Sequence, residues 1–116
     1  MRTAALGLAA FVASTPPAFA DDIMANYYGN TLVASSAATD LHIHYRADHT
    51  FDAAGTNASG PIAFHGKWSV NKKGDLCRDY DTPGKSKPVC TPWSAHEVGD
   101  TWELPGVTLT LEEGVQ

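Results

Sequence analysis

Apolar and polar residues alternate along most of this chain with a period of two, as is typical of β-strands that bury one face. The clearest run is PIAFHGKWSV at residues 61–70. One side of that segment carries the bulky apolar residues, namely Ile62, Phe64, Trp68 and Val70, together with Gly66. The other side carries His65, Lys67 and Ser69. Residues 41–46 follow the same rule and place Leu41, Ile43 and Tyr45 inward and His42, His44 and Arg46 outward.

Eight such segments are predicted, at residues 31–35, 41–46, 50–54, 61–70, 76–80, 89–96, 101–104 and 107–111. Turn sequences rich in Gly, Pro, Asn and Asp separate most of them. Residues 22–28 are the one plausible helical turn. Eight short strands in this order are typical of a sandwich or a closed barrel. We favour an all-β fold, a small antiparallel up-and-down barrel, because successive hairpins close it without long crossovers and closure removes exposed edges.

An eight-stranded barrel is just wide enough to be filled by side chains or to hold one small ligand. The inward positions are bulky enough to fill most of the interior, so we expect Trp68 to be structural. Any pocket is then shallow and lies at one open end, beside Trp93. The inward set is Leu41, Ile43, Tyr45, Ile62, Phe64, Trp68, Val70, Trp102, Leu104, Val107, Leu109 and Leu111.

The first twenty residues have the features of a secretory signal peptide. They contain one basic residue, Arg2, then an apolar run at residues 4–13, and they end in Ala-Phe-Ala. The run is too short to span a membrane, which takes roughly 20 residues. We therefore expect a signal peptide at residues 1–20, a single barrel domain at 21–116, no membrane span, and a periplasmic or secreted location.

Residues 21–116 contain seven Lys and Arg against thirteen Asp and Glu, a net charge of −6 with histidine neutral. An acidic chain without a basic cluster has no electrostatic complement to a phosphate backbone. Nucleic-acid binding is therefore not expected.

The two cysteines, Cys77 and Cys90, lie on either side of a Pro83-Gly84 turn sequence. A hairpin folded at that turn places them opposite each other, within reach of a disulfide. Export to an oxidising compartment favours the bond. A redox or zinc pair would need a closer spacing or further ligands, so we interpret the two residues as a structural disulfide.

The segments YYGNTL, YRADHTFDAAG and HGKWSVNKKGDLC, followed by a second cysteine, resemble a group of small exported bacterial proteins with a lipocalin-like (calycin-like) β-barrel. The matching positions are Gly29-Asn30-Thr31, Gly66-Lys67-Trp68, Leu76-Cys77 and Cys90. The chain departs from the pattern at residues 47–49, Ala-Asp-His, where Asp-Gly is usual. Few members have an assigned activity, so the resemblance implies a fold and a compartment and no reaction.

His42 and His44 share a strand face, as two ligands of one metal would. His65, Asp40 or Asp48 is a conceivable third ligand. However, Arg46 lies on the same face and would oppose a dication. We interpret the pair as the outward side of a strand, with a metal or heme contact as the alternative, and we expect no cofactor.

No nucleophile motif marks any serine, and the acidic pairs Asp79 with Asp81 and Glu112 with Glu113 are interpreted as solvated charges. We therefore expect no enzyme. Two hypotheses remain. In the first, the protein binds a small apolar ligand at one barrel end, through the candidate ligand-binding residues Trp93, Trp68, Trp102 and Tyr45. In the second, a solid barrel contacts an exported partner protein through its loops, as an interaction or inhibitor module.

Overall fold

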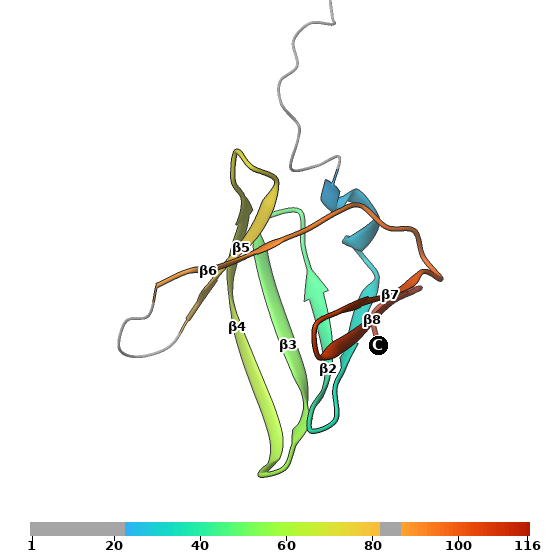
Figure 1. Ribbon diagram of the computed structural model, residues 1–116. Coiled ribbons are helices and arrows are strands. Elements are labelled where there is room, and N and C mark those ends of the chain that lie inside the picture. The colour runs from blue at the N-terminus through green and yellow to red at the C-terminus, as the bar shows by residue number, and fades with distance from the viewer. Residues whose placement is uncertain (1–22, 82–86) are drawn as a thin grey trace, which may run out of the picture.

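Eight antiparallel strands form one strongly curled sheet in the computed structural model, which describes residues 23–81 and 87–116 (Figure 1). The strands are β1 (Thr31–Ser35), β2 (Asp40–Tyr45), β3 (Thr50–Asn57), β4 (Gly60–Val70), β5 (Asp75–Tyr80), β6 (Val89–Pro92), β7 (Thr101–Leu104) and β8 (Val107–Glu112). A single 3-10 turn, η2 (Ala25–Tyr27), precedes them. Each predicted strand is found, and the predicted helical turn is confirmed as η2.

The sheet does not close, and the predicted closed barrel is wrong. Its strand order is β6-β5-β4-β3-β2-β1-β8-β7. β1 pairs with β8, as a barrel requires, but β6 and β7 are the two free edges. The result is an open half-barrel.

The opening lies where a predicted strand ends early. The alternation predicted a strand over residues 89–96, whereas β6 ends at Pro92. Proline has no backbone N–H to donate to a neighbouring strand, so it is unfavourable inside a sheet. Residues 93–100 contain no strand and carry the chain across to β7, as the orange segment in Figure 1 shows.

Two glycines allow neighbouring strands to approach closely where the sheet curls. A Cβ atom on Gly55 of β3 would overlap the backbone carbonyl of Asp40, and one on Gly66 of β4 would overlap that of Asp79. Glycines inside strands often mark such bends. Above Gly66 the rings of Phe51 and Tyr80 meet edge to face, with centroids 5.5 Å apart, and cover the gap that the missing side chain leaves.

The interior is filled at one end of the half-barrel only. Tyr27 of η2 and Met24, the residue just before η2, are buried against the aromatic residues of the nearby strand ends. The fully buried part of the core is Met24, Tyr27, Leu32, Tyr45, Phe51, Trp68, Leu76, Leu109 and Leu111. Other inward positions of the expected filling, including Leu41, Ile43, Ile62, Phe64, Leu104 and Val107, are only half-buried.

The connection between β6 and β7 is fastened to η2. The Tyr27 hydroxyl donates a hydrogen bond to the carbonyl of Ser94 at 3.1 Å, and the Asn26 amide donates one to the carbonyl of His96 at 2.9 Å. These bonds hold the connection over the filled end of the half-barrel.

Cys77 and Cys90 form the predicted disulfide. They are opposite each other on β5 and β6, with Cα atoms 3.9 Å apart. The turn predicted at Pro83-Gly84 lies outside the described residues. The bond ties the short edge strand β6 to the rest of the sheet.

Replacing both cysteines by serine should lower the free energy of unfolding by about 3 kcal/mol, since a disulfide of this loop length restricts the unfolded chain. Denaturant unfolding followed by circular dichroism measures the change. Reducing agent should shift the wild-type transition in the same direction and leave the double variant unaffected. Equal midpoints for the wild type and the variant would contradict the structural role.

Gly66→Ala should lower the free energy of unfolding by about 1–3 kcal/mol, because the added methyl group needs space that the Asp79 carbonyl occupies. Ser69→Ala is the matched control, since Ser69 is exposed on the same strand. The two variants can be compared in parallel urea titrations. Equal stability of both would mean that the close approach at Gly66 does not shape the sheet.

Candidate functional site

The concave face of the half-barrel encloses a cavity of about 590 Å³. Apolar side chains from β1 to β4, β7 and β8 supply most of its wall, and the start of the β6–β7 connection covers one side. The lining residues are Leu32, Ala34, Leu41, Ile43, Tyr45, Phe51, Phe64, Arg78, Tyr80, Thr91, Pro92, Trp93, Leu104, Pro105, Val107 and Leu109. Pockets that hold small molecules are typically apolar and about 300–1,000 Å³ in volume.

Arg78 is the one charged side chain among the described residues that line this cavity. Strand alternation turns it inward, between Leu76 and Tyr80 on β5, and it lies opposite Trp68 in the register. Its Nη2 atom donates a hydrogen bond of 3.3 Å to the Thr91 hydroxyl. Its guanidinium carbon lies 5.8 Å from the centre of the Trp93 ring, within cation–π range. No ion pair to Arg78 occurs within residues 23–81 and 87–116.

The surroundings keep Arg78 charged and Tyr45 neutral. Burial acts to lower the pKa of Arg78, but the phenols of Tyr45 and Tyr80 outweigh it and raise that pKa above its ordinary value. Burial also raises the pKa of Tyr45, which Arg78 only partly opposes. The cavity therefore contains a positive charge at every physiological pH.

Trp93 lies where the cavity meets the filled end of the interior. Its ring packs against Tyr27 and Tyr45, at centroid distances of 5.8 and 6.3 Å. Its indole Nε1 is buried and makes no hydrogen bond to the part of the chain that the structure describes. A buried donor without an acceptor costs roughly 1–3 kcal/mol.

The four residues predicted to bind a ligand lie in three different environments. Tyr45 and Trp93 line the cavity. Trp68 is only 2% exposed, donates a hydrogen bond from Nε1 to the Arg46 carbonyl and does not line the cavity. Trp102 stacks on His96, with centroids 3.5 Å apart, and lines a smaller hollow of about 200 Å³ that also touches Trp93. Sequence reasoning missed Arg78, although its strand position already pointed inward.

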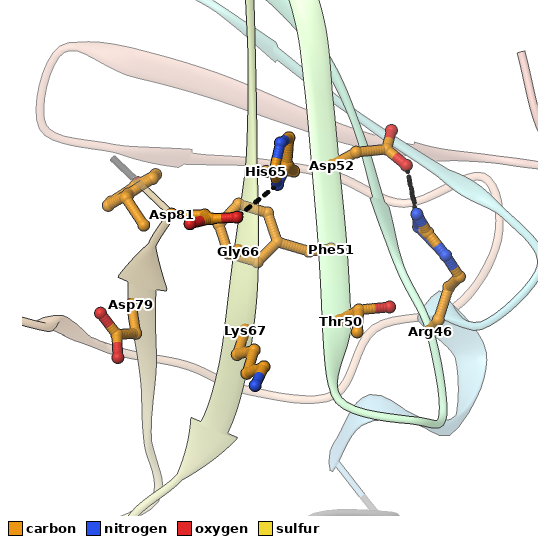
Figure 2. Close-up of a pocket in the computed structure, with 10 residues that line it drawn as sticks. Arg46, Thr50, Phe51, Asp52, His65, Gly66, Lys67, Asp79 and Asp81 are labelled. Atoms are coloured by element: carbon orange, nitrogen blue, oxygen red, sulfur yellow. Dashed lines mark hydrogen bonds and ion pairs between the residues drawn. The ribbon is translucent and has the colours of Figure 1, made fainter. Parts of the chain in front are cut away.

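A second hollow, of about 670 Å³, lies mainly among outward-facing side chains of β3, β4 and β5 (Figure 2). Its charges are largely paired. Asp52 accepts hydrogen bonds from the Arg46 guanidinium, and His65 lies 3.4 Å from Asp81. Lys67 is opposite Asp79 in the strand register, on the same outward face. This hollow contains no apolar floor comparable to that of the concave cavity, so we do not choose it as the site.

The histidine pair of β2 lies on the outward face. His44 contacts Asp52 through Nδ1 at 2.9 Å and the Gln116 carbonyl through Nε2 at 3.0 Å. Of its conceivable partners, Asp40 accepts a hydrogen bond from Ser35, and Asp48 accepts hydrogen bonds from Thr50. Across the described ranges, no group of three or more His, Cys, Asp or Glu side chains could hold a metal ion.

The fold and the cavity define an all-β protein, an open eight-stranded half-barrel with an apolar concave face and one inward arginine. No protein-family model matches the chain, and neither the curated proteins nor the solved structures contain a match. In the described residues no helix is long and apolar enough to cross a membrane.

Trp68→Ala should lower the free energy of unfolding by about 3–5 kcal/mol, because it removes a buried indole from the centre of the core. Trp93→Ala should cost less, since Trp93 is half-buried and its deletion also removes an unsatisfied donor. Chemical unfolding of both variants gives the comparison. A larger loss for Trp93→Ala would show that the β6–β7 connection, rather than Trp68, is central to stability.

Proposed function

We propose that this protein is an exported, non-enzymatic binding protein that holds a small, largely apolar ligand against the concave face of its half-barrel. The observation that carries the proposal is the row of half-buried apolar side chains along the cavity, which includes Leu41, Ile43, Phe64, Leu104 and Val107. A ligand that covered them would remove apolar surface from water, which contributes roughly 25 cal/mol for each Å².

The size and shape of the site support a small molecule. A volume of about 590 Å³ lies in the range of small-molecule pockets. The wall comes mostly from strands, and the covering connection is hydrogen-bonded to η2, so much of the site exists before a ligand arrives. Binding then requires little ordering of the chain, which favours affinity.

The alternative hypothesis, an inhibitor or interaction module with a solid barrel, has less support. It requires inward side chains to fill the interior, and they fill only the end beside η2. The ligand site that we propose also differs from the shallow end pocket expected from the sequence, because it extends along the concave face.

Val107→Trp should weaken binding of the neutral apolar fluorophore N-phenyl-1-naphthylamine by about tenfold or more, because an indole at this position projects into the cavity. Thr108→Trp is the matched control, since the next position along β8 faces outward and should bind as the wild type does. Fluorescence titration measures both. Failure of the wild type to bind the probe, or equal weakening in the two variants, would overturn the proposed site.

A further inference from the structure

The cavity carries a charge that its apolar wall does not balance. Arg78 projects into it from β5, and the contacts of its guanidinium are the hydroxyls of Thr91, Tyr45 and Tyr80 and the Trp93 ring. No carboxylate forms an ion pair with it in the described parts of the chain. Withdrawing a charged group from water is costly unless an opposite charge compensates for it.

The acidic residues nearest to Arg78 in sequence face the other way. Asp79 lies on the outward face opposite Lys67, and Asp81 lies 3.4 Å from His65. Strand alternation prevents Asp79 from reaching the cavity without breaking the pairing of β4 with β5. The guanidinium therefore retains donor capacity, since arginine has five N–H groups and the hydroxyls of Thr91, Tyr45 and Tyr80 accept only part of them.

We propose that the ligand of this cavity is an amphiphile with one anionic head group, a carboxylate, sulfate or phosphate, and that Arg78 binds the head while the apolar wall holds the tail. The inference rests on the proposed function and adds the chemical class of the ligand. The planar guanidinium fork is well suited to bidentate contact with such oxygens.

The orientation of the ligand follows from the two ends of the cavity. Arg78 lies opposite Trp68, next to the aromatic cluster that fills the interior. Leu41, Leu104 and Val107 lie toward the unfilled end. The head group thus lies inside, within reach of the Trp93 region, and the tail extends along the apolar wall toward the opening.

The overall acidity of the chain does not oppose this arrangement. Exposed charges farther away than about 8–10 Å are largely screened at physiological ionic strength. A half-buried guanidinium acts at contact distance, where its hydrogen bonds to an anion are short and strong. The specificity for an anion is therefore local to Arg78.

The test uses three ligands with the same ten-carbon tail: decanoate, 1-decanol and decyltrimethylammonium. Each displaces N-phenyl-1-naphthylamine from the purified protein, which reports its affinity. Hydrogen bonds to charged groups are strong enough that decanoate should bind about tenfold or more tightly than 1-decanol. The cation should bind most weakly.

Arg78→Gln should abolish the preference for decanoate over 1-decanol. Lys67→Gln, on the outward face of the adjacent strand, should keep the preference. Should the glutamine variant fail to fold, Arg78→Met retains an apolar side chain against the Trp93 ring. NMR spectra of the wild type provide a test that needs no substitution. The Nε–H resonance of Arg78 should shift when decanoate is added and should not shift with 1-decanol.

The outcomes separate the two proposals. Equal affinities of the wild type for decanoate and 1-decanol would overturn the anionic head group and leave the apolar site intact. No binding of any ligand or of the fluorophore would overturn both proposals. A wild-type dimer that excludes every ligand would also overturn both and assign the concave face to a second copy of the chain.

Discussion

The pairing that does not form between β6 and β7 determines the rest of this structure. β6 ends at Pro92, and the backbone that follows crosses over the sheet instead of adding to its edge. A closed barrel of this size would leave an interior for side chains or one small ligand. The open half-barrel instead exposes its concave face on one side, which leaves room for a cavity in a chain of only 116 residues.

An open sheet must bury its inner face by other means, and the aromatic cluster beside η2 does so at one end. Tyr27 enters from the 3-10 turn and meets Tyr45 edge to face at 6.2 Å, while Trp68 packs against Tyr45 from β4 at 6.4 Å. Aromatic pairs in such arrangements contribute about 0.5–1.5 kcal/mol beyond the area they bury. The filled end therefore provides stability, and the unfilled end is available to a ligand.

The sequence was sufficient to predict the strands and which residues face inward, because apolar and polar residues alternate where one face of a strand is buried. It also predicted that Cys77 lies opposite Cys90, from a turn sequence midway between them, and the two residues are opposite each other in the strand register. Alternation does not determine which edges pair, so the opening beside β6 could not be predicted with the same rule. Arg78 was missed for a different reason. Its position on β5 points inward, but its charge is typical of an outward residue.

The order of the strands also has a consequence for how the chain folds. Of the seven strand pairings in the described residues, six join strands that are neighbours in sequence, and β1 with β8 is the exception. Leu32 is paired with Leu111, 79 residues later in the chain (111 − 32), so this pairing carries most of the loop-closure entropy. We expect the local hairpins to form early and the pairing of β1 with β8 to form late, so the rate of folding should depend mainly on how fast these two strands meet.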